Sequence, residues 1–338
     1  MRKMFLFAAA AMVSLSSCVQ TNEVYTGKLN EMGFKSAVTR GIIQSNEDMI
    51  YPIAVTAILD NSEESTGNYV SYFENAKFVY DDATSLWKGE PARYWPTSGV
   101  MNFVALCPYP VTATIQTAYT ANGKFDKLTF GTIDNNIKDQ HDVLYSDILN
   151  VKAPQKAAQS LFFHHAYSQL NVTFQKTASA AKVVIKSVAV NDVNLSGILN
   201  VTPVEATLDS ENNRIGGSTA TWTVGLPIQR YFLDADATGI EDNALDVELA
   251  ADSAFAPIPA LVIPGLQTEI EIVYTIDGFE HTFIHDLSKD ARGEAITPVP
   301  DWKMGHKYTY NYTINVNEII FDCEVDEWKP VDGGSTTI

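Results

Sequence analysis

Apolar and polar residues alternate along much of this chain, and few segments show the spacing of an amphipathic helix. The clearest alternation lies near the C-terminus, where threonine and asparagine separate Tyr308, Tyr310, Tyr312, Ile314 and Val316. Aromatic and β-branched residues at every second position are typical of a strand that buries one face. The pattern therefore predicts a half-buried strand at this place.

A terminal strand is predicted after a short break. Its apolar row consists of Ile319, Phe321, Cys323 and Val325, which alternate with acidic residues. Pairs such as Asn-Gly, Gly-Gly and Asp-Gly are typical of the turns between strands. Many short strands separated in this way indicate an all-β fold of antiparallel sandwiches. Further strands are predicted over residues 53–59, 78–80, 101–106, 170–174, 183–190, 220–224 and 270–276.

The length of the chain fits two domains of ordinary size. It has 338 residues, and most domains have about 100–150. A polar segment at residues 150–155 interrupts the strand pattern. We therefore expect one β-sandwich domain over residues 41–155 and a second over residues 156–338. A weakly patterned segment over residues 18–40 precedes them.

The first residues have the order of parts found in an export signal. Two basic residues precede an apolar run at residues 5–13, and Leu15-Ser16-Ser17-Cys18 then fits the site at which bacterial lipoproteins are acylated and cut. The apolar run is too short to span a bilayer permanently. The sequence therefore predicts a signal peptide over residues 1–17 and lipidation of Cys18. Acyl chains would hold the mature chain to a membrane surface.

The chain is strongly acidic. Asp and Glu number 41 and Lys and Arg 23, which gives a formal net charge of −18. Such a surface repels phosphate backbones, so nucleic acid is not expected as a partner. Cys107 and Cys323 remain if Cys18 carries lipid. One disulfide and two free thiols are both compatible with an exported chain.

Motifs of catalysis and metal binding are absent from the sequence. The chain has no Gly-x-Ser-x-Gly, no P-loop, no His-Glu-x-x-His, and no Gly-x-Gly-x-x-Gly after a predicted strand. It also lacks the cysteine and histidine spacings of zinc sites. We therefore expect no enzyme activity, no cofactor and no metal. A glycosidase stays an alternative, because its two acids come from distant strands and leave no motif.

Three polar segments could form sites but have simpler explanations. His164-His165 should point to opposite faces of a strand, one buried and one exposed, so the two cannot chelate one metal. Residues 139–142, Asp-Gln-His-Asp, are expected in a solvated loop. Residues 234–239 resemble the start of a calcium loop, but Leu245 stands where a bidentate acid is required.

Trp87, Tyr94 and Trp95 form an aromatic cluster beside two prolines. Aromatic rings of this density could stack on sugars, which supports the alternative of a cell-surface glycan-binding lipoprotein. They could equally close one end of a β-sandwich. The second interpretation is favoured, because buried aromatic rings dominate protein cores.

Four groups of residues stand in an order that resembles a known family. They are residues 92–96 with 100–109, 142–146 with 161–170, Trp302-Lys303-Met304-Gly305, and Val325-Asp326-Glu327-Trp328. They resemble motifs of the fimbrillin-like (Mfa-like) lipoproteins of Bacteroidales, which are subunits of type V pili. The similarity covers most of residues 40–330.

The resemblance implies two tandem transthyretin-like β-sandwich domains, an outer-membrane lipoprotein and a cell-surface fimbrium. In stalk subunits of the family an arginine-specific protease is thought to remove the N-terminal strand, and the matching position here is Arg40, before Gly41. The exposed groove then accepts a C-terminal strand of a neighbouring subunit. The candidate donor strand is the row Ile319, Phe321, Cys323 and Val325, although pairing within its own domain stays open.

The expected function is therefore a structural pilus subunit or fimbrillin-like adhesin. Its expected partners are other pilus subunits, the outer membrane through the lipid, and a host or bacterial surface ligand. A stalk, tip or anchor position is left open.

Overall fold

The computed structural model describes the greater part of the chain. The described residues are 30–37, 51–60, 69–109, 115–119, 125–130, 137, 140–177, 182–208, 214–233, 245–251, 253–257, 259–266, 268–290, 293–296, 301–315 and 319–327. Cys18, Arg40, Gly41 and residues 234–239 lie outside them.

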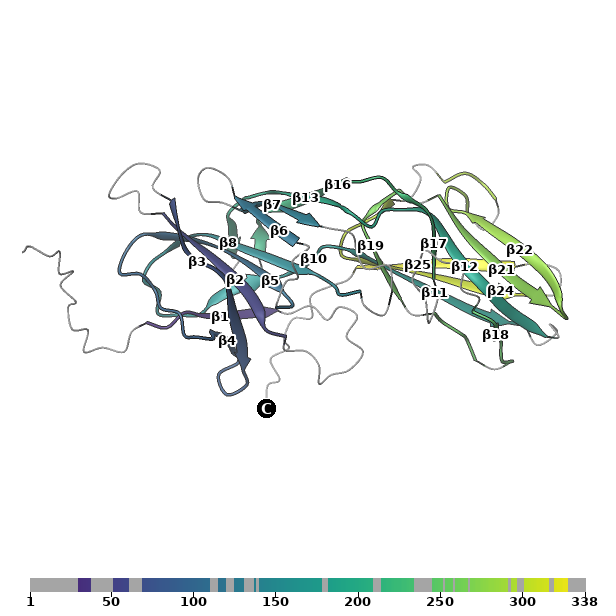
Figure 1. Ribbon diagram of the computed structural model, residues 1–338, viewed down its shortest axis with the longest axis horizontal. Coiled ribbons are helices and arrows are strands. Elements are labelled where there is room, and N and C mark those ends of the chain that lie inside the picture. Colours follow the sequence, from purple (N-terminus) through teal and green to yellow (C-terminus); the bar gives the residue numbers. More distant parts are fainter. Residues whose placement is uncertain are drawn as a thin grey trace, which may run out of the picture.

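The described residues form strands and connecting segments, without an α-helix (Figure 1). No helix among them is long and apolar enough to cross a membrane. Each segment predicted from alternation coincides with a strand, which confirms the all-β class. The strands are β1 (Gly33–Ala37), β2 (Ile53–Asp60), β3 (Tyr69–Asp81), β4 (Leu86–Gly89), β5 (Val100–Cys107), β6 (Ile115–Tyr119), β7 (Phe125–Phe130), β8 (Leu144–Lys152), β9 (Gln159–Phe162), β10 (His164–His165), β11 (Ser168–Lys176), β12 (Val183–Val193), β13 (Gly197–Thr202), β14 (Ala206–Leu208), β15 (Arg214–Gly216), β16 (Thr219–Val224), β17 (Ile228–Phe232), β18 (Val247–Glu248), β19 (Ala260–Val262), β20 (Gly265–Leu266), β21 (Glu269–Ile276), β22 (Phe279–Asp286), β23 (Asp301–Trp302), β24 (His306–Ile314) and β25 (Ile319–Glu327).

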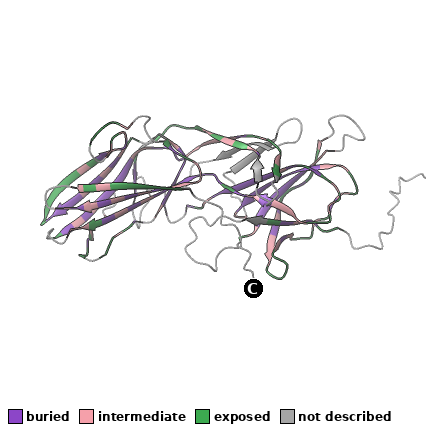
Figure 2. Ribbon diagram, turned by 180° about the vertical axis from the view of Figure 1, so that it is seen from behind, coloured by how far each residue is buried: buried purple, intermediate pink, exposed green. Residues whose placement is uncertain are grey.

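The largest sheet has eight strands in the order β10-β8-β5-β2-β3-β4-β1-β9. Its inner strands β2 and β5 are buried along nearly their whole length, and Figure 2 shows such buried segments on strands in both halves of the molecule. Phe103 and Ala105 of β5 pack into one hydrophobic cluster, whereas Val104 and Leu106 pack into a second cluster on the other face. A strand without a solvent-exposed face needs a nearly continuous apolar sequence rather than an alternating one, and Val100–Cys107 has it.

The two ends of this sheet lie next to each other. A single residue, Phe163, separates β9 from β10. The Phe162 N–H donates a hydrogen bond to Ser146 Oγ of β8 over 3.0 Å. Among the described residues, β8 and β9 are not paired as strands. We call these facing edges of β8 and β9 the seam.

A four-stranded sheet, in the order β16-β13-β7-β6, lies beside the first one. In it β7 pairs with β13, and in the large sheet β8 pairs with β10. Both pairs join strands from either side of residue 155. The division into domains at residues 155 and 156 stays a prediction, as does the transthyretin-like arrangement.

The C-terminal half is a sandwich of two sheets. One has the order β19-β11-β24-β25, and the other has β17-β12-β21-β22 with β18 also paired to β12. Tyr308, Tyr310, Tyr312 and Ile314 of β24 are buried, which confirms the predicted half-buried strand. The ring centroids of Tyr312 and Phe283 on β22 are 6.2 Å apart, so residues of the two sheets meet in this core.

Pairing is antiparallel between all paired strands of the described residues except β1–β9 and β11–β24. On the outer face of the β11–β24 pair, side chains form a row of hydrogen bonds. Asn171 Nδ2 donates to Thr309 Oγ1 over 3.2 Å, and Gln175 Nε2 donates to Thr313 Oγ1 over 2.7 Å. These bonds fix the register of the parallel pair, because a shift of one residue would turn the row inward.

The stability of the C-terminal sandwich should fall in mild acid through His285. This side chain is 5 % exposed, and burial lowers its pKa from 6.5 to about 4 while neighbouring Asp286 opposes the shift. The unfolded chain binds a proton in this pH window and the folded chain does not. The contribution of His285 is therefore complete above pH 6.5 and is lost as the pH falls towards 4, by up to about 1.4 kcal/mol per pH unit.

Thermal unfolding followed between neutral pH and about pH 4.5 checks this expectation. His285→Phe should weaken the dependence of the melting temperature on pH. His281→Phe, in the exposed first part of the same strand, is the control and should retain it. An unchanged pH profile in His285→Phe would contradict the assignment.

Candidate functional site

The strand β1 lies inside a sheet although it belongs to the N-terminal segment. On one side it pairs antiparallel with β4, with Phe34 opposite Trp87. On the other side it pairs parallel with β9, with Lys35 opposite Ser160. The main chain just before β1 is also held, since the Met32 N–H donates to the Arg93 carbonyl over 2.7 Å. We call the space between β4 and β9 that β1 fills the β1 slot.

Two apolar side chains of this segment enter the core. Met32 and Phe34 are both 0 % exposed. The Phe34 ring lies edge-on to Phe78 and Phe103, with centroid distances of 5.2 and 5.4 Å. Edge-to-face pairs of this kind stabilise a core beyond their buried area. The sequence signal for this burial is short, because only two apolar residues at alternate positions mark it.

β1 supports more of the fold than its five residues suggest. β9 is the last strand of its sheet, and β1 is its partner there. A protein without β1 would expose the backbone edges of both β4 and β9 and the apolar floor beneath Phe34. Unpaired edges and bare apolar surface are both costly in water, so an empty β1 slot would favour a replacement strand.

The candidate donor residues lie on β25, in the other half of the elongated molecule (Figure 1). β25 pairs with β24 along its whole length and forms the edge of its sheet. Ile319 and Phe321 are half-buried, whereas Cys323 and Val325 are exposed. Only the first half of the predicted apolar row therefore faces the chain's own core. The donor role stays a prediction.

The tryptophans of the aromatic cluster are buried. Trp87 is 3 % and Trp95 8 % exposed, and Tyr94 is 41 % exposed. Trp95 lies edge-on to Phe103 at 5.6 Å, and Trp87 Nε1 donates to the Tyr51 carbonyl over 3.2 Å. The favoured interpretation as core residues is confirmed for both tryptophans, which leaves no sugar-stacking surface on them.

The histidine pair has the expected orientation, because His165 is buried and His164 exposed. The expected solvated loop at residues 139–142 is wrong for Asp142. Its side chain is 9 % exposed and lies 2.6 Å from His165 Nδ1. The error arises because His165 on β10 pairs with Leu144, which draws the residues just before β8 inward. His141 is exposed, and Asp139 lies outside the described residues.

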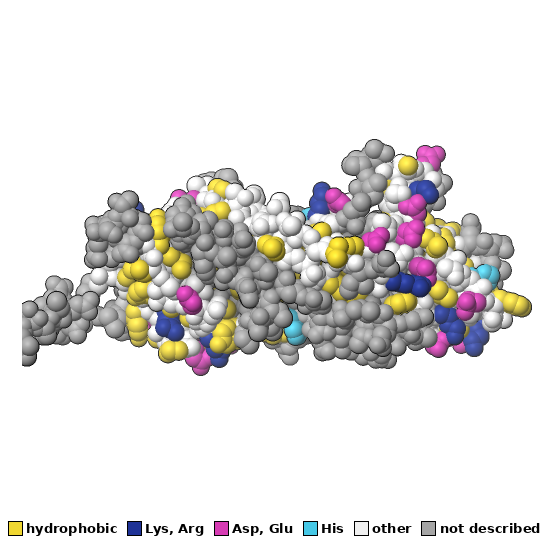
Figure 3. All heavy atoms as spheres, turned by 45° about the horizontal axis from the view of Figure 1, so that its top comes forward, with side chains coloured by type: hydrophobic (Ala, Val, Ile, Leu, Met, Phe, Trp, Pro, Cys, Tyr) yellow, Lys and Arg dark blue, Asp and Glu magenta, His cyan; other side chains and the backbone are white. Residues whose placement is uncertain are grey.

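The described residues contain no group of three or more His, Cys, Asp or Glu side chains placed to hold a metal ion. Cys107 and Cys323 are free thiols. Burial raises the pKa of Cys107 to about 12, so this thiol lacks the thiolate character of a nucleophile. On the face drawn in Figure 3, acidic side chains gather mainly over the C-terminal sandwich.

Comparison with known proteins places this geometry in context. The profile described as fimbrillin-like matches residues 39–328, and no curated protein matches the chain. A candidate cell adhesion protein from Bacteroides uniformis has 16 % identity and a TM-score of 0.51 over 88 % of this chain and 98 % of that one. A fimbrial protein from Bacteroides vulgatus has 16 % identity and a TM-score of 0.47, covering 88 % and 99 %.

The tip fimbrial protein Mfa3 from Porphyromonas gingivalis has 8 % identity and a TM-score of 0.40, covering 88 % and 98 %. At 16 % identity, the likeness to the Bacteroides uniformis protein supports the fold alone. The family match is different in kind, because it extends over well over half of the sequence and includes the motifs at residues 92–109, 142–170 and 302–328. The chain therefore belongs to the fimbrillin-like family.

Proposed function

We propose that this chain is a structural pilus subunit or fimbrillin-like adhesin that is exported as a lipoprotein and assembles by β-strand exchange. The observation that carries the proposal is the placement of β1. This strand ends at Ala37, three residues before Arg40, and it is hydrogen-bonded on both sides. A cut after Arg40 would break the covalent connection between β1 and the rest of the chain. The family match begins at Thr39, which is compatible with a body that starts near this point.

The energetics favour refilling of the β1 slot over leaving it empty. Burial of a methionine or phenylalanine contributes about 1.5–3 kcal/mol each, and Met32 and Phe34 are completely buried. A replacement strand must restore this burial and pair with β4 and β9 at once. A segment with apolar residues at alternate positions meets both requirements.

β25 is paired on one side only, whereas β1 is paired on both. Val325 of β25 is 53 % exposed. Release of β25 would break one row of hydrogen bonds and uncover Ile319, Phe321 and the rings that Phe321 contacts, those of Phe283, His285 and Tyr312. The exposed side chains of Asp322, Glu324 and Asp326 are charged, which disfavours non-specific pairing of this edge strand with other chains.

Membrane attachment forms the second part of the proposal. Lipid on Cys18 would hold the uncut chain at the outer membrane, and cleavage after Arg40 would separate the subunit from that anchor. Assembly and release would thus be linked by one cut. The partners are other pilus subunits and, for an adhesin, a host or bacterial surface ligand. We propose no catalytic activity.

Processing at Arg40 is tested by N-terminal sequencing of protein extracted from the cell surface. The native chain is expected to start at Gly41. Arg40→Lys preserves the positive charge but removes the arginine that the protease requires, so this variant should start at Cys18. A native chain that starts at Cys18 alone would remove the processing step.

Strand donation is tested with two substitutions on β25. Val325 belongs to the candidate donor row, and Ile320 points to the opposite face; they are 53 % and 54 % exposed. Val325→Asp should therefore change the stability of the isolated chain by no more than about 0.5 kcal/mol, as should Ile320→Asp. In a β1 slot, however, the carboxylate introduced by Val325→Asp would be buried without a partner, which strongly disfavours polymers.

Ladders on unboiled gels provide the readout. Native protein and Ile320→Asp should form them, and Val325→Asp should lose them. Phe321→Asp should also lose them. This substitution removes the contact with His285, at a centroid distance of 3.8 Å, and could therefore act by destabilising the fold, so it is interpreted only together with Val325→Asp. Equal ladders from Val325→Asp and native protein would show that β25 is not the donor strand.

A further inference from the structure

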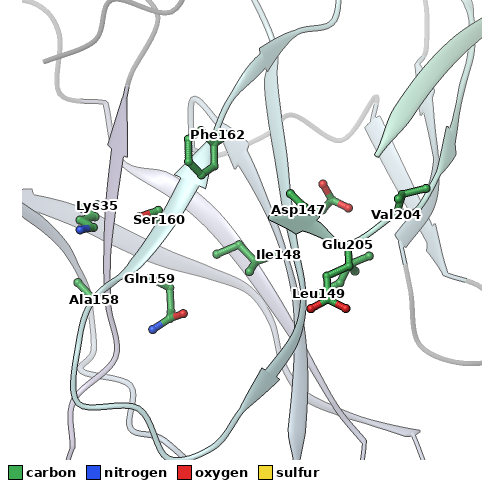
Figure 4. Close-up of a pocket in the computed structure, with 11 residues that line it drawn as sticks. Lys35, Asp147, Ile148, Leu149, Ala158, Gln159, Ser160, Phe162, Val204 and Glu205 are labelled. Atoms are coloured by element: carbon green, nitrogen blue, oxygen red, sulfur yellow. The ribbon is translucent and has the colours of Figure 1, made fainter. Parts of the chain in front are cut away.

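A cavity of about 350 Å³ opens at the seam between β8 and β9 (Figure 4). One wall comes from Gln159, Ser160 and Phe162 of β9. The opposite wall comes from Asp147 and Ile148 of β8 and from the segment after β13. The volume lies in the range of roughly 300–1,000 Å³ that is usual for small-molecule sites. None of the sequence motifs pointed to this place.

The cavity combines apolar surface with polar groups of several kinds. Phe162 and Ile148 supply apolar surface, and the carboxylates of Asp147 and Glu205 supply acceptors. Lys35, which reaches the cavity from β1, supplies an ammonium donor, and Ser160 a hydroxyl group. Sites that orient a small polar ligand usually combine hydrogen-bond donors, acceptors and an aromatic ring around one partly open space.

Hydrogen bonds hold the wall beyond β8 in place. The Ser218 hydroxyl donates to the Asp147 carboxylate and accepts from the Val204 N–H over 3.0 Å. Asn150 Nδ2 donates to Glu205 Oε2 over 2.8 Å. Asp147 is 6 % exposed. These bonds tie β8, the segment after β13 and the start of β16 together, so the polar groups are positioned before a ligand arrives.

The chemistry of the walls points to a polyhydroxylated ligand. Hydroxyl groups of a sugar can donate to carboxylates and accept from an ammonium group at the same time. The apolar face of a pyranose ring fits against Phe162 or Ile148. Two carboxylates against one lysine, on a chain with net charge −18, disfavour an anionic sugar.

We propose that the seam cavity is a carbohydrate subsite that binds one neutral sugar unit. The half-open form admits a unit at the end or the side of a longer glycan. The site is separate from the aromatic cluster at Trp87 and Trp95, and in the uncut chain it is complete because β1 supplies Lys35. An extended peptide pairing with the edges of the seam is the competing occupant. The charged side chains around the cavity oppose it, because a backbone strand laid over them would remove the water that solvates them.

The test uses the uncut, full-length chain, in which β1 supplies Lys35. Saturation-transfer NMR is recorded with glucose, galactose, mannose and N-acetylglucosamine, with glucuronate as an acidic probe and a synthetic peptide of residues 319–327 as a peptide probe. At least one neutral sugar is expected to bind, with a dissociation constant on the order of 1 mM for a single unit. Glucuronate and the peptide are expected to bind more weakly or not at all.

Substitutions then locate the site. Glu205→Ala and Lys35→Ala should each lower the affinity about tenfold, because each removes a charged hydrogen-bonding partner. The controls are Glu280→Ala and Lys152→Ala, which remove exposed charges of the same kind outside the cavity and should leave affinity unchanged. Melting temperatures show that each variant is folded.

Absence of any neutral-sugar signal would overturn the proposal. Preference for glucuronate or for the peptide would do the same, and so would equal losses of affinity in the cavity variants and the controls. None of these outcomes bears on pilus assembly, because gel ladders report the β1 slot and sugar binding reports the seam.

Discussion

Two-sided backbone pairing of β1 is the interaction on which the N-terminal half depends. β9 has β1 as its partner in the large sheet, and β9 continues through Phe163 into β10 and then β11. The strand at the start of the described chain thus determines where the chain crosses into the C-terminal sandwich. Phe34 adds the packing that makes this pairing specific, since its ring contacts two phenylalanines of other strands.

The sequence predicts those parts of the fold in which one strand face is buried and the other exposed. Alternation predicted β24, and four of its side chains are buried in the structure. The Asp277-Gly278 pair predicted the turn between β21 and β22, and both residues adopt positive φ angles there. The strands predicted over residues 53–59 and 101–106 also coincide with β2 and β5, which are buried along nearly their whole length. In each of these cases local sequence and tertiary environment agree.

Other parts depend on partners that are distant in sequence. The parallel pairing of β1 with β9 joins residues more than a hundred positions apart, and nothing near Met32 or Phe34 indicates pairing on both sides. Asp142 looked solvated because its partner, His165, is supplied by another strand. The seam cavity is built from four separate segments, and its polar residues are ordinary ones when read singly.

The register of β1 has a consequence for a polymer. Lys35 stands opposite Ser160 and also forms part of the cavity wall. Any strand that takes the place of β1 must present its own side chain at that position. In a chain of joined subunits, one corner of each cavity would then be furnished by the neighbouring molecule. Polymerisation and ligand preference would then be thermodynamically linked, because only the unassembled precursor would have Lys35 in its cavity.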